Sequence, residues 1–357
     1  MSYPKLIIDR KTLRDNVKSI LELAGSKGVE IVAVIKGING NPGMMETVIE
    51  AGAETLASSR LNQLRKVKEI NSKIKTYALR IPMLSEVEEL VESADISLNS
   101  ELEVLKKINE VCLKKGTTHD VIIMCELGDL REGIYDKDEL EKVAKAVEFD
   151  MDGLHLLGIG TNLGCYGSIL PTVEKMNELV ERAHFVNKVI GREVEVISGG
   201  ATTSFPLVAK GLMPKEINQL RMGEGLFINA LDDSFKYSLF DNESLVLQAE
   251  IIELKTKPSY PIGEIAVNAF GDKVKYEDKG VRKRAILALG SQDIGDYNHL
   301  RPLDKDIDVI GGSSDHTIID VTESETEYHI GDIVEFHLKY GTMMMATQSE
   351  YIEKEFI

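Results

Sequence analysis

Through the first 230 residues, short apolar runs alternate with longer stretches in which apolar residues recur at helical spacing. The short runs are rich in β-branched residues and predict strands at 31–35, 55–57, 76–79, 96–98, 121–125, 154–159, 194–197 and 219–221. The longer stretches predict amphipathic helices at 11–23, 61–70, 85–91, 101–113, 139–147 and 173–190. Strands that alternate with helices are parallel, so these units predict a TIM-type (β/α)8 barrel over residues 11–230, which agrees better with the pattern than a doubly wound open sheet.

The pattern changes after residue 230. Extended or alternating segments follow one another, separated by turns rich in Gly, Pro and Asp, at 244–255, 262–269, 284–290, 306–311, 317–321 and 333–338. They predict an all-β domain over residues 231–357, with a linker at 231–234 and no long helix. A further apolar run at 6–9 predicts a strand, and we expect the N-terminal residues 1–10 to pack on the β domain.

Composition and charge bear on where the protein is located and on which partners it binds. The 357 residues include 43% hydrophobic residues, enough for a large core, but no apolar run of the roughly 20 residues that a membrane helix needs. The first residues lack the apolar core of a signal peptide, so we expect a cytoplasmic protein. A formal charge of −17 disfavours nucleic acid and anionic membranes as partners and is compatible with a cationic substrate. The three cysteines and seven histidines show no metal-binding spacing, so no metal site is expected.

Lys36 stands at the end of the first predicted barrel strand and is followed by two glycines within four residues. One interpretation is a lysine that reaches out to solvent from the end of a strand. The other is a Schiff-base lysine, whose pKa is lowered by burial so that the free amine attacks a carbonyl, with pyridoxal phosphate as cofactor.

The ends of the later strands help to decide, because the chemistry of such barrels lies there. Arg131 follows the fifth strand and Asn162 the sixth. Small and hydroxyl-bearing residues follow the seventh and eighth strands and offer backbone N–H groups to a phosphate: Ser198, Gly200, Ala201, Thr202, Gly223 and Glu224. A phosphate site opposite an amine suits a phosphorylated aldehyde, and Arg221 is positioned to face its ring.

Several motifs together resemble a known family. They are the opening segment 6–16, Ala33-Val-Ile-Lys36, Leu127-Gly-Asp-Leu-Arg131-Glu-Gly133, Arg221-Met-Gly223, and Val309 to His316 followed by Asp320-Val-Thr322. Over nearly its whole length, the chain is similar to the alanine-racemase-like, fold type III pyridoxal-phosphate enzymes, and most of all to those that act on ornithine. The resemblance therefore implies a barrel with a C-terminal β domain and an isomerase that interconverts L- and D-amino acids.

The resemblance also assigns roles. Lys36 would hold the cofactor and act as one base, and Arg221 would donate a hydrogen bond to the pyridine nitrogen. Asn162, the loop residues after the last two strands, and Tyr340 would complete the cofactor site. Arg131, with Ser314 and Asp315, would position the substrate. Because Ser314 belongs to the β domain, a head-to-tail homodimer would complete each site.

Three positions depart from the family pattern. Gly40 and Asn41 lie where a phosphate-binding tyrosine is usual, and Asn162 lies where alanine racemases commonly have a histidine. Ser291 matches the tyrosine that serves as second base. Since an unactivated serine is a poor base, we expect Asp293 to assist or replace it. Further candidates for this role are Cys165, Tyr166, Asp315 and His316.

The substrate follows from weaker signals. Acidic residues such as Asp293 and Asp315 suit a cationic side chain, so the expected reaction is the two-base racemisation of ornithine or a related basic amino acid. Alternatives are an alanine, lysine or broad-specificity racemase, a D-amino-acid lyase or aldolase of the same fold type, and a carrier protein that binds pyridoxal phosphate without catalysis. A barrel enzyme in which Lys36 is purely structural is a further alternative.

Overall fold

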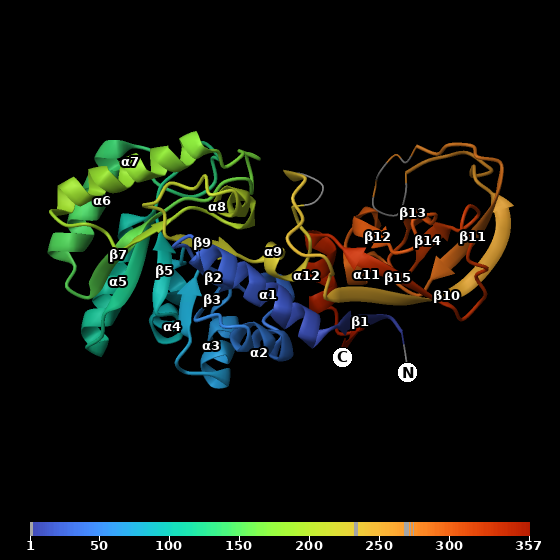
Figure 1. The fold of residues 1–357 in the computed structure, drawn as a ribbon, viewed down its shortest axis with the longest axis horizontal. Coiled ribbons are helices and arrows are strands. Elements are labelled where there is room, and N and C mark those ends of the chain that lie inside the picture. The colour runs from blue at the N-terminus through green and yellow to red at the C-terminus, as the bar shows by residue number, and fades with distance from the viewer. Residues whose placement is uncertain (1–2, 232–234, 268–270, 272, 274) are drawn as a thin grey trace. The chain divides into compact units, whose positions relative to one another are not determined.

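The computed structural model describes residues 3–231, 235–267, 271, 273 and 275–357. It divides into two compact units, Leu13–Asp241 and Met1–Thr12 with Asn242–Ile357 (Figure 1). Three of the four residues of the predicted linker, 232–234, lie outside the described residues.

The first unit is a closed barrel of eight parallel strands in chain order, which confirms the predicted fold class. The strands are β2 (Glu30–Val34), β3 (Thr55–Ser58), β4 (Lys75–Ala78), β5 (Ile96–Asn99), β6 (His119–Met124), β7 (Leu154–Gly160), β8 (Val196–Ser198) and β9 (Gln219–Met222). The barrel closes because β9 pairs with β2, with Leu220 opposite Ile31. All eight carboxyl ends therefore lie at one end of the barrel.

Helices surround the strands (Figure 1). They are α1 (Arg10–Gly25), α2 (Pro42–Glu50), α3 (Leu61–Ile70), α4 (Val87–Ser93), α5 (Leu102–Lys115), α6 (Lys137–Asp150), α7 (Val173–Ile190), α8 (Phe205–Ala209) and α9 (Glu224–Phe227), with short 3-10 turns η1 (Lys36–Ile38), η2 (Leu84–Glu86) and η3 (Thr202–Ser204). The pattern did not predict α2. The pair Asn41-Pro42 is nevertheless a typical helix start. The Asn41 side chain accepts a hydrogen bond from the Met44 N–H, and Pro42 occupies the first turn.

Two apolar cores hold the barrel together. Alternate strand residues fill its interior, including Val32 and Val34 of β2 and Tyr77 of β4. A larger core lies between the strands and helices α3 to α7. This double burial explains why the strands appear in the sequence as uninterrupted apolar runs.

The second unit is an antiparallel sheet in the order β12-β15-β10-β11-β14-β13. Its elements are β1 (Lys5–Ile8), β10 (Leu245–Pro258), β11 (Val281–Leu287), β12 (Leu300–Pro302), β13 (Asp308–Gly312), β14 (Thr317–Asp320), β15 (Ile333–Leu338), β16 (Glu353–Phe356), α11 (Ser291–Ile294), α12 (Tyr340–Gln348) and η4 (Tyr297–His299). The N-terminal strand β1 pairs with β10 and β16. Among the described helices, none is long and apolar enough to cross a membrane.

One predicted strand of this unit was wrong, and a helix was not predicted. Residues 262–267 of the predicted strand 262–269 form no strand, and residues 268 and 269 lie outside the described residues. Helix α12 was missed because its residues, Tyr-Gly-Thr-Met-Met-Met-Ala-Thr-Gln, have no clear polar face, so periodicity does not mark them as helical.

Candidate active site

Lys36 lies directly after β2, at the start of η1, and its side chain is half-buried. Burial lowers its pKa, and the positive charges of Arg131 and Arg221 lower it further, whereas Cys165 and Glu132 act to raise it. These four residues come from the loops after β6 and β7 and from β9. Residues predicted separately from the sequence therefore lie in one electrostatic environment, and the lysine carries a more readily available free amine than an exposed lysine does.

Arg221 is the buried cation of this site. It lies on β9, and its Nη2 donates a 2.6 Å hydrogen bond to the Thr161 carbonyl while its Nη1 donates to the Ser198 hydroxyl. Burial lowers the pKa of its guanidinium. Thr161 follows β7 and Ser198 ends β8, so the hydrogen bonds of Arg221 connect the ends of β7, β8 and β9. Ser198, predicted to bind cofactor, thus contacts Arg221.

The loop after β8 packs against α9. The Thr202 hydroxyl accepts a 3.2 Å hydrogen bond from the Gly225 N–H, and a Cβ on Gly225 would lie 2.6 Å from the Thr202 methyl group. Gly200 has φ +106, a conformation that favours glycine, and a Cβ there would lie 2.7 Å from the Ser204 hydroxyl. The predicted residues Gly200, Ala201 and Thr202 therefore belong to one tight turn.

Gly223 and Glu224 lie at the start of α9. A Cβ on Gly223 would come within 3.1 Å of the Val34 side chain, so a side chain at this position would fit only if Val34 moved slightly. Burial raises the pKa of the Glu224 carboxyl to about 7. At neutral pH this carboxyl is therefore able to donate or accept a hydrogen bond.

Two buried polar atoms in this region have no hydrogen-bond partner in the described structure, Asn162 Nδ2 and Ser204 Oγ. Buried donors without partners carry a free-energy cost of about 1–3 kcal/mol each, so a ligand that offers acceptors satisfies them. Ser204 lies in the turn of Gly200, whose carbonyl oxygen accepts a 2.9 Å hydrogen bond from the Arg221 N–H, and Asn162 follows Thr161, whose carbonyl accepts from the Arg221 side chain. The residues present fit an anionic group joined to an aromatic aldehyde.

Sequence reasoning missed Ser204. Its signal lay in the run Ser198-Gly-Gly-Ala-Thr-Thr-Ser204, in which the first hydroxyls were named and the last was not. Only the turn geometry distinguishes them, because Ser198 and Thr202 have protein partners and Ser204 has none.

Arg131 is already paired. Its Nη2 donates a 2.7 Å hydrogen bond to Glu132, and its Nε forms an ion pair with the same carboxylate. Burial lowers the pKa of Arg131, but the bonds to Glu132 raise it by more, so it stays charged. Glu132 was not among the predicted site residues, and its only signal in the sequence was its position next to Arg131.

Of the predicted residues of the β domain, Asp293, Asp315 and His316 line a cavity of about 540 Å³, together with Ile252, Ala288, Gln292 and Tyr351, whereas Ser291, Ser314 and Tyr340 are not among its lining residues. Ser291 and Gln292 donate backbone hydrogen bonds to Ser313 and Ser314, so the two loops run together. Buried Asp293 accepts a 2.7 Å hydrogen bond from Ser349. Ser314 donates to Asp315 at 3.0 Å, and Tyr340 begins α12 in this same unit.

No group of three metal-binding side chains occurs in the part of the chain that the structure describes.

Comparisons with known proteins place the chain in a family. Residues 8–230 match the family model described as alanine racemase, N-terminal domain. The chain is 41% identical over 357 residues to an ornithine racemase of Acetoanaerobium sticklandii, covering 99% of this chain and 100% of that protein. It is 36% identical over 355 residues to a lysine racemase of Thermotoga maritima, covering 99% and 98%.

Among solved structures, an alanine racemase from Bartonella henselae with covalently bound pyridoxal phosphate superposes with a TM-score of 0.74 at 15% identity, covering 100% of both chains. Together the fold, the site and these relatives define an amino-acid racemase built on a barrel and a β domain. The chain belongs to the alanine racemase family.

Proposed function

We propose that this racemase uses pyridoxal phosphate to interconvert the L and D forms of ornithine or a closely related basic amino acid. The observation that carries the proposal is the half-buried Lys36, whose pKa is lowered by burial and by the charges of Arg131 and Arg221. The substrate rests on the full-length similarity to the ornithine and lysine racemases.

The residues that would hold the cofactor divide by chemistry. Lys36 would bind it covalently, and Arg221 would face its pyridine nitrogen. Ser204, with the backbone around Gly200 and Gly223, would bind the phosphate, while Asn162 would lie beside the ring. When bound, pyridoxal phosphate withdraws electrons from the substrate α-carbon and so acidifies the α-proton.

The protein then moves two protons. Once the substrate amine has replaced it on the cofactor, Lys36 Nζ would be free to remove the α-proton from one face, which needs the neutral amine that its lowered pKa favours. A second acid returns a proton to the opposite face. Arg131 would hold the substrate carboxylate through charge-assisted hydrogen bonds.

The β domain would supply the second acid. Ser291 and Asp293 are the first candidates, because Asp293 is buried and hydrogen-bonded and lies at the cavity. The same cavity combines apolar Ile252 and Ala288 with the carboxylates of Asp293 and Asp315, which suits an aliphatic chain that ends in an ammonium group.

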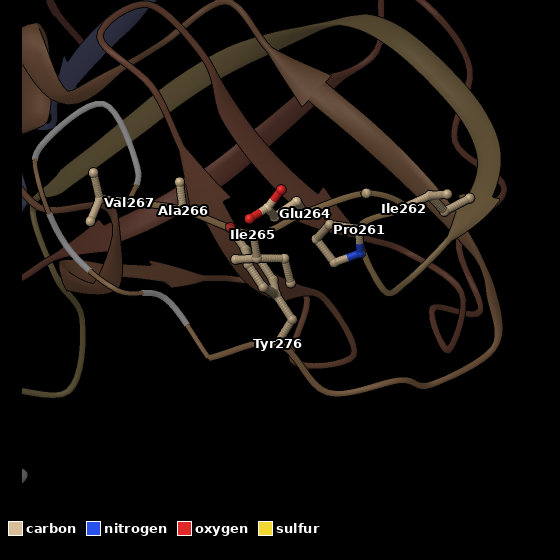
Figure 2. A pocket seen from close by; sticks show the side chains of 8 residues that line it. Pro261, Ile262, Glu264, Ile265, Ala266, Val267 and Tyr276 are labelled. Carbon is tan, nitrogen blue, oxygen red and sulfur yellow. The ribbon is translucent and has the colours of Figure 1, made fainter.

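A homodimer would bring this cavity of one subunit to the barrel of the other. The β domain carries an exposed apolar segment, Pro261 to Val267, that lines a shallow pocket together with Tyr276 (Figure 2). Ile262 is 91% exposed and Val267 56% exposed. Exposed apolar patches of this kind mark protein interfaces, and a second copy of this chain is the partner that the proposed site requires.

Incubation of the cofactor-loaded protein with L-ornithine in D2O tests the proposal, with L-lysine and L-alanine in parallel. We expect D-ornithine with deuterium at the α-carbon, and faster turnover of the basic amino acids than of alanine. Lys36→Ala should abolish both products, whereas the exposed control Lys106→Ala should leave them unchanged. Deuterium exchange without inversion would contradict a second acid, and a preference for L-alanine would contradict the substrate.

A further inference from the structure

Asp129 is a fully buried carboxylate beside the candidate site, and no step of the proposed reaction uses it. It lies in the loop between β6 and α6, two residues before Arg131. Its carboxylate accepts hydrogen bonds from four backbone N–H groups, those of Gly164 (3.0 Å), Cys165 (3.3 Å), Tyr166 (3.0 Å) and Ile169 (3.3 Å). All four donors belong to the loop after β7, which also contains Asn162.

The main chain of Asp129 contacts the same loop. Its carbonyl oxygen accepts a 3.1 Å hydrogen bond from the Gly167 N–H. A Cβ on Gly167 would lie 2.7 Å from that oxygen, so the loop comes this close only with glycine at the position. One residue therefore binds five backbone amides of a neighbouring loop.

The charge of Asp129 makes this contact strong. Burial acts to raise the pKa of its carboxyl, but the four N–H groups lower the pKa by more, so the net shift is downward. The side chain stays ionised at neutral pH, and hydrogen bonds to an ionised acceptor are stronger than those between neutral groups. An amide in its place would turn donors toward two of the four N–H groups.

A second carboxylate shapes the loop that carries Asp129. Glu126 accepts hydrogen bonds from the backbone N–H groups of Gly128 and Arg131, the latter at 3.0 Å. Between Asp129 and Arg131, Leu130 has φ +57, a conformation that a leucine adopts only when its surroundings impose it. The backbone leading into Arg131 is therefore held by two carboxylates, those of Glu126 and Asp129.

We propose that Asp129 is a positioning residue that fixes the loop of Arg131 relative to the loop of Asn162. The contact keeps a constant spacing between the guanidinium that binds the substrate carboxylate and the amide beside the cofactor ring. The α-carbon then lies at a fixed place relative to Lys36. This inference rests on the roles proposed above for Arg131 and Asn162.

Asp129→Asn in the cofactor-loaded protein tests the inference. Amide hydrogen exchange in residues 161–170 should become at least about tenfold faster, because two of the four backbone N–H groups bound by the carboxylate lose their acceptor. We expect kcat/KM for the amino acid to fall roughly 10- to 100-fold, mainly through KM, since small displacements of positioning groups have effects of this size. The affinity for pyridoxal phosphate should fall less than the affinity for the amino acid, because Lys36, Arg221 and Ser204 lie outside the loosened loop and only Asn162 of the cofactor residues belongs to it.

The matched control is Asp136→Asn. Asp136 is the exposed N-cap of α6 and accepts two backbone hydrogen bonds, but it lies outside the site. It should alter neither exchange in residues 161–170 nor KM. Gly167→Ala approaches the same contact from the other loop and serves if Asp129→Asn does not fold. Because both variants break one contact, their effects should not add.

Unchanged exchange in residues 161–170 would overturn the inference, and so would faster exchange with unchanged KM, which would indicate a purely structural contact. A loss of cofactor affinity as large as the rise in KM would also overturn it, since the residue would then act through the cofactor. Absence of racemisation by the wild-type protein would instead contradict the proposed function, while the exchange measurement still reports on the loop contact.

Discussion

At the barrel end, burial and neighbouring charges shift the pKa values of single side chains. The pKa of Lys36 is lowered by burial and by two arginines, while Glu132 opposes that shift. The pKa of Glu224 is raised to about 7 by burial. Arg221 stays buried because Ser198 and Thr161 accept its hydrogen bonds. The proton chemistry of the site therefore depends on charge placement as much as on residue type.

Glu132→Gln should lower the pKa of Lys36 further. The Glu132 carboxylate favours the protonated amine, so removing its charge favours the neutral form. The rate at which cofactor-free protein combines with pyridoxal phosphate should therefore reach its midpoint at a lower pH than in the wild type. The exposed Glu141→Gln is the control. A midpoint that stays in place or moves upward would refute the assignment of Glu132 to this environment.

Ser204→Ala should weaken cofactor binding. A hydrogen bond to a charged phosphate contributes about 1.5–3 kcal/mol, so the dissociation constant should rise roughly tenfold or more. Titration of the cofactor-free protein by absorbance measures it. Thr203→Ala removes the neighbouring hydroxyl, which contacts the Leu163 carbonyl at 3.4 Å, and should have little effect. Equal losses in the two variants would exclude a specific role for Ser204.

Predicted and observed elements agree best where burial imposes a regular pattern of apolar residues. Helix α7 was predicted with the bounds observed, Val173–Ile190, and each barrel strand overlaps its predicted range. Several short elements were missed, and two of them, α2 and α12, have apolar residues on several faces, so periodicity did not distinguish them from loops. Periodicity also does not report how closely two neighbouring strands approach each other.

Gly158→Ala tests such a close approach. A Cβ at Gly158 of β7 would overlap the Val196 carbonyl oxygen of β8, so the strands would have to separate. The free energy of unfolding should fall by about 1–3 kcal/mol or more, measured by urea denaturation. Gly25→Ala is the control, because no atom lies within 4 Å of its Cβ position at the end of α1. Equal stability of the two variants would show that the barrel adjusts to the methyl group.

At the scale of the whole molecule, the candidate residues divide between two units. Lys36, Arg131 and Arg221 belong to the barrel, and Ser291, Asp293 and Asp315 belong to the β domain. A head-to-tail homodimer, as proposed above, would combine the barrel of one subunit with the β domain of the other.

Subunit mixing distinguishes a shared site from a self-contained one. If each site combines two chains, unfolding and refolding Lys36→Ala together with Asp293→Asn should yield mixed dimers with one intact site. The recovered activity would be about a quarter of the wild-type value for equal amounts and random pairing. Activity no greater than the sum of the separate variants would contradict a site shared between subunits.

The barrel, the β domain and the lysine at the first strand end could be predicted from the sequence alone. Each is encoded locally, in apolar runs, helical periodicity and a motif of a few residues. Only the tertiary structure decided which hydroxyl of 198–204 lacks a partner, that Glu132 pairs with Arg131, and that Asp129 binds the loop of Asn162. These contacts join segments up to tens of residues apart or depend on side-chain direction, and a linear pattern contains neither.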